Sequence, residues 1–122
     1  MKNQTTQVEV EGKATDAVDQ NCSGQICEVR VRLTKIPAGF RVTVIQRRIL
    51  ILENGEEQLL SKDTEHGEVE GFNLDLIERR AREVAENVPM NDGLVLKAAN
   101  FAFLRWISTN WGLVLPESAM SE

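Results

Sequence analysis

The chain has 122 residues, which is enough for one ordinary domain and leaves little room for two. Hydrophobic residues make up 42% and charged residues 27%, a globular composition that argues against global disorder. The formal net charge of −5 provides no overall basic footprint for nucleic acid. We therefore expect a single domain over residues 1–122, with flexible tails at residues 1–6 and 117–122.

The N-terminal residues lack the apolar segment of a secretory signal, and no apolar run is long enough to cross a bilayer. The two cysteines are fewer than a disulfide-stapled secreted domain usually carries. These observations predict a cytoplasmic protein that does not associate with membranes.

Charge is distributed in blocks along the chain. Residues 25–52 carry six basic residues against one acid, and residues 53–72 carry one lysine against seven acids. The simplest interpretation is that the two blocks form neighbouring strands that neutralise each other.

Short alternating segments predict the first strands. Val8 and Val10 alternate with polar residues and indicate a short strand that ends at Gly12. The mostly polar residues 13–24 indicate a loop. Residues 25–35 alternate strictly, with apolar side chains on one face and charged ones on the other, which predicts a strand with one solvent-exposed face.

A proline–glycine turn over residues 36–39 leads into the next predicted strand, residues 40–53. The second half of this strand is apolar on both faces over residues 49–52. Such a segment must be covered on both sides, or it must hold a bulge near Arg47 and Arg48.

The dipeptide Asn54-Gly55 is the strongest hairpin signal in the chain and favours a type I′ turn, in which both central residues have φ > 0. Two leucines at residues 59–60 then mark a return strand, which we expect to fade by residue 63. The acidic residues 63–71 are predicted to form a loop or a frayed edge.

Two helices are predicted after the strands, and their apolar faces differ. Asn73 is a good N-cap for the first helix, which has one apolar stripe and ends before Pro89. The second helix starts at Asn91 or Asp92 and runs to about Trp111. It is apolar nearly all round, so it must be covered nearly all round.

These elements predict an α+β architecture, an antiparallel β-meander of about four strands followed by two C-terminal helices packed on one face. Residues 113–115 are apolar and allow one further short strand before Pro116. The chain contains no internal repeat and no linker, in agreement with one domain.

The sequence carries no catalytic motif and no clear metal-binding motif. His66 is the only histidine, tyrosine is absent, and neither a Gly-x-Ser-x-Gly elbow nor a phosphate-binding glycine loop is present. Cys22 and Cys27 could join His66 as ligands, but structural zinc usually takes four Cys or His ligands in clearer spacing. We expect no enzyme activity, metal or cofactor; an enzyme that uses one of the two thiols is the third alternative.

Arginines gather on one sheet face if residues 26–35 pair with residues 40–48 across the turn at residues 37–39. Such a face can follow a phosphate backbone, although it lacks the aromatic side chains on which bases stack. The competing interpretation is that these arginines form cross-strand pairs with acids from residues 9–11 and 53–57. The candidate polyanion-binding residues are Arg30, Arg32, Arg41, Arg47 and Arg48.

The second helix offers another candidate surface, although its simplest role is that of a core helix. Its alanines permit close helix approach, and its aromatic residues are of the kind that interfaces favour. The candidate partner or self-association residues are Phe103, Trp106 and Trp111.

The leading hypothesis is a non-enzymatic protein-binding module, acting as an inhibitor, adaptor or accessory factor and forming a homodimer. Small acidic proteins of phages or mobile elements that block a host complex fit the same description. The alternative is a nucleic-acid-binding protein that uses the basic sheet face.

Overall fold

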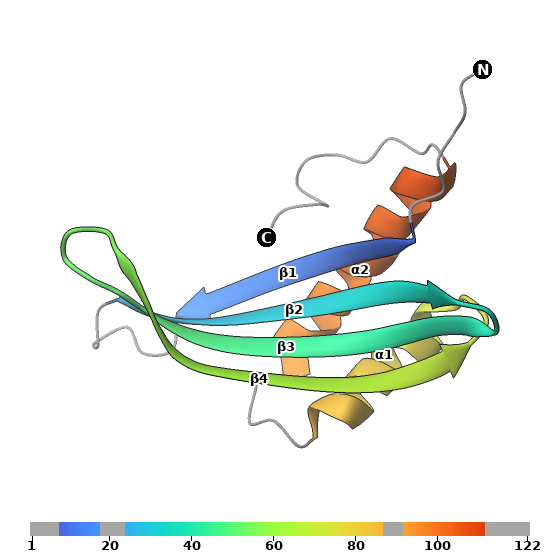
Figure 1. Cartoon of the computed structure of the whole chain (residues 1–122), viewed down its shortest axis with the longest axis horizontal. Helices are drawn as coiled ribbons and strands as arrows, with labels where there is room; N and C mark the ends of the chain where they lie inside the picture. Colours follow the sequence, from blue (N-terminus) through green and yellow to red (C-terminus); the bar gives the residue numbers. More distant parts are fainter. Residues whose placement is uncertain (1–7, 18–23, 87–91, 112–122) are drawn as a thin grey trace.

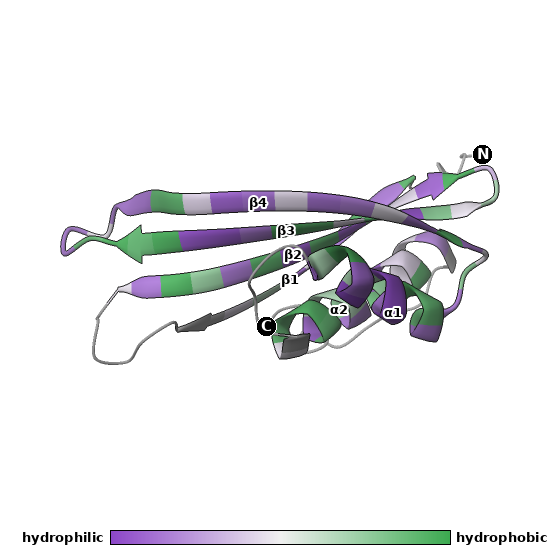
Figure 2. Cartoon of the chain, turned by 90° about the horizontal axis from the view of Figure 1, so that it is seen from below, coloured by the Kyte–Doolittle hydropathy of each residue, from purple (hydrophilic) through white to green (hydrophobic). Residues whose placement is uncertain are grey.

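The computed structural model describes residues 8–17, 24–86 and 92–111. Four strands form one antiparallel sheet in the order β1-β2-β3-β4, and two helices follow them in the chain (Figure 1). The elements are β1 (Glu9–Ala17), β2 (Gln25–Ile36), β3 (Gly39–Ile51), β4 (Glu57–Glu70), α1 (Leu74–Ala85) and α2 (Asp92–Trp111). The predicted α+β architecture is confirmed, since both helices pack on the same face of the meander (Figure 2).

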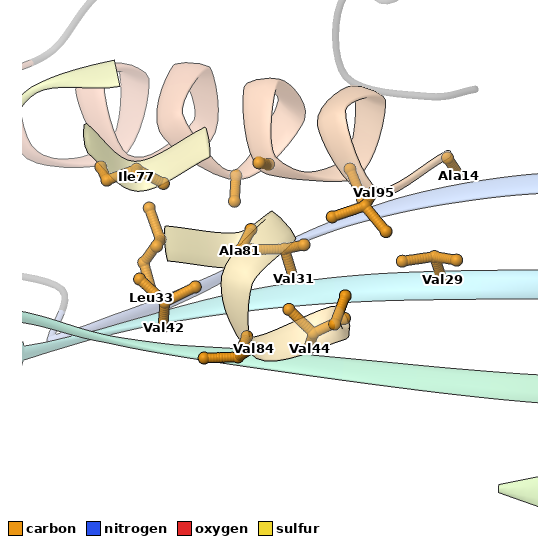
Figure 3. Close-up of a cluster of buried hydrophobic side chains, with 14 of the residues drawn as sticks. Ala14, Val29, Val31, Leu33, Val42, Val44, Ile77, Ala81, Val84 and Val95 are labelled. Atoms are coloured by element: carbon orange, nitrogen blue, oxygen red, sulfur yellow. The ribbon is translucent and has the colours of Figure 1, made fainter. Parts of the chain in front are cut away.

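The core lies between this inner face of the sheet and the two helices. Alternate residues of β2 and β3 are completely buried, and the register places Val31 beside Val44 and Leu33 beside Val42. Ile77 and Ala81 of α1 and Val95 of α2 face these strand residues from above (Figure 3). The strict alternation of the sequence in β2 therefore follows because the apolar core lies against one face of the strand and charged side chains occupy the other.

The two helices divide the sheet between them. α2 packs on β1 and β2, whereas α1 packs on β3 and β4. Asn73 caps α1 as predicted, because its Oδ1 accepts a hydrogen bond from the Leu76 N–H at 3.2 Å. The bounds of α2 agree with the prediction, and neither described helix has the length and apolar content to cross a membrane.

The first strand is longer than predicted and continues through Gly12 to Ala17. Gly12 is buried, and a Cβ there would lie closer than 3.0 Å to backbone atoms of Ala98 and Ala102 in α2. A glycine inside a strand often marks such a close approach of another backbone. The predicted loop is thus wrong for residues 13–17, because Gly12 allows α2 to sit directly on this strand.

The two hairpins lie where they are predicted, but the second has a different turn. The Gly55 N–H donates to the Leu52 carbonyl at 2.8 Å, and the Leu52 N–H donates to the Glu56 carbonyl at 2.8 Å. Gly55 has φ of 90°, and no described residue other than glycine has positive φ. This geometry is a type I turn followed by a left-handed glycine, so the predicted type I′ turn is wrong. Asn54 instead accepts a hydrogen bond from the Glu56 N–H at 2.9 Å.

The fourth strand is also longer than predicted. Instead of fading by Asp63, it pairs with β3 as far as Glu70. Its polar residues have low β-propensity, but pairing with β3 satisfies one row of their backbone groups. The bulge predicted near the arginine pair is present, because the register shifts between Arg48 and Ile49 and leaves Leu60 as the extra residue of β4.

The helices cover only part of the sheet. The hairpin that joins β3 to β4 projects beyond both helices (Figure 1). The predicted tails at residues 1–6 and 117–122, and the short strand allowed at residues 113–115, lie outside the described residues.

Candidate functional site

The outer face of the sheet, opposite the helices, carries a ladder of alternating charges. Glu28 is at its centre: Arg30 donates to it from Nε at 2.9 Å and from Nη2 at 3.4 Å, and Arg47 donates from Nη1 at 3.1 Å. Arg30 also donates to Glu11 at 3.1 Å, and Arg32 donates to the other oxygen of Glu11 at 3.0 Å. The ladder therefore crosses β1, β2 and β3 without interruption.

The central carboxylate of this ladder, Glu28, is buried and therefore needs charged hydrogen-bond donors around it. The Glu28 side chain is only 7% exposed, and a buried carboxylate is tolerated when charged donors surround it. The hydrogen bond from Arg30 to Glu28 is the main cause that raises the pKa of the Arg30 guanidinium above its ordinary value. Arg30 and Arg47 thus both form ion pairs with Glu28.

The structure shows where each candidate polyanion-binding residue lies. Arg30, Arg32, Arg41 and Arg47 share the outer face, as the strand pairing predicts. All four form ion pairs. The closest carboxylate lies within 3.1 Å of Arg30, Arg32 and Arg47, whereas Arg41 is 3.5 Å from Glu68. Arg48 departs from the prediction, because it has the parity of the inner face and forms no ion pair with a described residue.

The pairing also identifies which acids neutralise the arginines. The predicted acids from residues 9–11 are confirmed, since Glu9 and Glu11 both contact Arg32. The predicted pairing with acids from residues 53–57 is wrong, because the long β4 places Glu68 opposite Arg41. Exposed pairs such as Arg41–Glu68 are worth about 0–1 kcal/mol each.

The aromatic residues of α2 were the other sequence candidates. Trp106 is 6% exposed and packs edge-on against Phe40, with ring centroids 4.8 Å apart. Phe103 is partly buried and stacks on Phe72 at 4.5 Å. Trp106 is therefore a core residue, and Phe103 presents only part of its ring to solvent. The side chain of Trp111 lies outside the described residues.

Three exposed leucines lie at the end of the sheet that the β3–β4 hairpin forms. We call Leu52, Leu59 and Leu60 the leucine end; they lie in the β3–β4 hairpin and are 37%, 50% and 42% exposed. On the outer face, the register aligns Ile26, Ile49 and Leu59 in one row across three strands. Large exposed apolar patches mark interaction sites on many proteins.

The sequence contained a signal for the leucine end. Residues 49–52 are apolar on both faces, which required either cover or a bulge, and the structure has the bulge. The helices lie farther along the sheet, so they leave Leu52, Leu59 and Leu60 uncovered (Figure 1).

The two described residues that were considered for chemistry, His66 and Cys27, lie on strands that are not neighbours in the sheet. His66 lies on β4, where its Nδ1 is 3.0 Å from the Thr43 hydroxyl, while Cys27 on β2 accepts a hydrogen bond from Gln46 at 3.5 Å. Cys22 lies outside the described residues. Within the described part of the chain, no group of three potential ligands is placed to hold a metal ion.

Comparison with known proteins found no match: no protein-family model or curated protein matches the sequence, and no solved structure matches the fold.

Proposed function

We propose that the chain is a non-enzymatic protein-binding module, acting as an inhibitor, adaptor or accessory factor, and that the leucine end is its contact surface. The observation that carries the proposal is the exposure of Leu52, Leu59 and Leu60 in one projecting hairpin. Because these side chains are only 37–50% exposed, burying the remaining surface against a partner would contribute about 0.6–1.5 kcal/mol for each.

The electrostatics of the outer face favour this proposal over nucleic-acid binding. Arg30 and Arg47 share the buried Glu28, and Arg32 is held by Glu11. A phosphate backbone would have to compete with these carboxylates for Arg30, Arg32 and Arg47, so the gain from counterion release at these residues would be small. The leucine end has no comparable partner among the described residues.

For self-association too, we propose the leucine end in place of the surface predicted on α2. The interface predicted on α2 loses its central residue, because Trp106 packs into the core. A second copy of the chain is therefore one of the partners that the leucine end could bind.

Photo-crosslinking tests the proposal with an internal control. Leu60 on the hairpin and Leu76 on α1 are similarly exposed, at 42% and 39%. A benzophenone amino acid at residue 60 should give a discrete protein adduct in cells that express the protein, and the same group at residue 76 should not. An adduct of twice the chain mass would identify a homodimer, and a different mass would identify a separate partner. Equal labelling at both positions, or none at residue 60, would contradict the proposal.

A further inference from the structure

The edge of the sheet at β4 combines outward-facing backbone groups with an excess of carboxylates. We propose that this edge binds an extended basic segment of a partner protein, which adds to the sheet as a fifth strand. The inference rests on the proposed protein-binding function and specifies the chemistry of the partner. Adding a strand to a free edge is a common mode of peptide recognition.

The backbone of β4 presents a row of free hydrogen-bonding groups. The Gly71 N–H donates to the Ala38 carbonyl at 3.1 Å, which identifies the odd-numbered residues of β4 as those bonded to β3. The even-numbered residues that follow the bulge, Lys62 to Glu68, therefore direct N–H and C=O away from the sheet. Arg80 confirms this direction, since its Nε donates to the Glu68 carbonyl at 2.9 Å.

The open part of the edge has a defined length. Arg80 occupies the edge at Glu68, and the bulge at Leu60 interrupts the regular ladder at the other end. The segment between them, residues 62–67, spans about 20 Å at 3.4 Å per residue. Within the described residues, the outward backbone groups of Thr64 and His66 have no partner. This length accommodates a short extended segment.

The charge of β4 selects a basic partner. The strand carries five carboxylates against Lys62. Asp63 and Glu65 lie on the inner side of the edge and form no ion pair with a described residue. A partner strand that places Lys or Arg at every second position would meet both carboxylates, and opposite charges across strands contribute about 0.2–1 kcal/mol per pair. The exposed Leu59 then favours an apolar residue at the adjacent end of the partner.

The same charges disfavour a second copy of the chain at this edge. Pairing two β4 strands would bring carboxylates of one copy near those of the other, and like charges across strands are destabilising. Charged edge strands generally prevent proteins from pairing with copies of themselves. A partner of opposite charge is the occupant that this edge fits best.

The test uses a fluorescein-labelled peptide of about nine residues, in which lysine alternates with valine and threonine. We expect its fluorescence anisotropy to rise on binding to the wild-type protein, and the binding to weaken as salt increases. A matched peptide with glutamate in place of lysine should not bind. Equal binding of the two peptides would overturn the inference.

Substitutions at Thr64 separate strand addition from simple charge attraction. Thr64→Pro removes an outward N–H that β3 does not use, and Thr64→Ala keeps it. We expect peptide affinity at least about tenfold lower for Thr64→Pro than for Thr64→Ala. Should the proline variant fail to fold, a lysine peptide N-methylated at alternate residues tests the reciprocal bonds, in which peptide N–H groups donate to the outward carbonyls of β4. Equal affinity in the matched pair overturns strand addition.

Hydrogen exchange locates the bound peptide and separates the two proposals. Binding should slow exchange of the Thr64 and His66 amides, which have no hydrogen-bond partner among the residues that the structure describes. Protection at β1 alone would overturn the inference. If the peptide does not bind while crosslinking at Leu60 persists, only the basic-strand inference fails. If the peptide binds and crosslinking is absent, the leucine end is the part that is wrong.

Discussion

Replacing Gly12 with alanine tests how closely α2 packs on β1. The added Cβ would lie closer than 3.0 Å to the Ala98 oxygen, the Ala102 nitrogen and the Phe101 carbonyl carbon, whereas ordinary contacts begin at 3.4 Å. All three atoms belong to the backbone, so no side-chain rotation relieves the overlap. The helix must therefore move away from the strand.

Two opposing effects determine how much Gly12→Ala changes the free energy of unfolding. Alanine restricts the unfolded chain and, where the backbone conformation is compatible, stabilises a protein by about 0.4–1 kcal/mol. The φ of Gly12 is not positive, so alanine is compatible with its backbone. Overpacking costs about 1–3 kcal/mol, and the retreat of α2 also weakens the contacts of Ala98 and Ala102, which are fully buried. We expect the free energy of unfolding to fall by about 2–3 kcal/mol.

Urea denaturation followed by tryptophan fluorescence measures this change, because Trp106 is buried in the folded protein. With a slope of about 1.5 kcal/mol per molar urea, the midpoint should fall by about 1.5 M. Lys13→Ala is the matched control, since Lys13 is the exposed neighbour, and its effect should stay within about 0.5 kcal/mol. A Gly12→Ala protein more stable than the wild type would refute the close approach, because only the unfolded-state effect would remain.

Two further substitutions test local features of the fold. Glu28→Gln should lower the free energy of unfolding by about 1–3 kcal/mol, because Arg30 and Arg47 lose the charge of their shared, buried acceptor. Glu68→Gln, which alters an exposed pair, should change it by less than about 0.5 kcal/mol, and equal effects in urea denaturation would contradict the burial argument. Asn73→Ala should cost about 1 kcal/mol in thermal unfolding, through loss of the N-cap of α1. Asn73→Asp keeps an acceptor at this position, and equal losses in both variants would show that the cap does not contribute.

The parts of the fold that were predicted correctly depend on local sequence patterns. Alternation of apolar and charged residues identified β2, and helical periodicity together with Asn73 identified α1. The bounds of α2 followed from the capping residues Asn91 and Asp92 and from Gly112 as a stop signal, and the bulge followed from the change of pattern after Arg48. In each case the signal lies within a few residues of the element that it predicts.

The errors occur where a distant partner decides the local structure. Residues 63–70 lack a β-forming pattern, yet they form a strand because β3 offers them a complete row of backbone partners. Gly12 looked like the end of a strand, although it is the residue that admits α2. For the candidate sites, Trp106 had interface chemistry, but the fold uses it to fill the core between α2 and Phe40.

The sequence by itself determined the class of the fold, the order of its elements and the side of the sheet to which the arginines of β2 and β3 point. Once β2 and β3 pair across their turn, the period of two places Arg30, Arg32, Arg41 and Arg47 on one face. Only the tertiary structure decided whether they are available, because ion pairing depends on register. Once β1 and β2 align with Glu11 opposite Arg32, and Glu28 lies between Arg30 and Arg47, the basic face becomes a neutralised one. The same assembly covers one part of the sheet with helices and leaves Leu59 and Leu60 exposed at its other end, which the chain's composition could not specify.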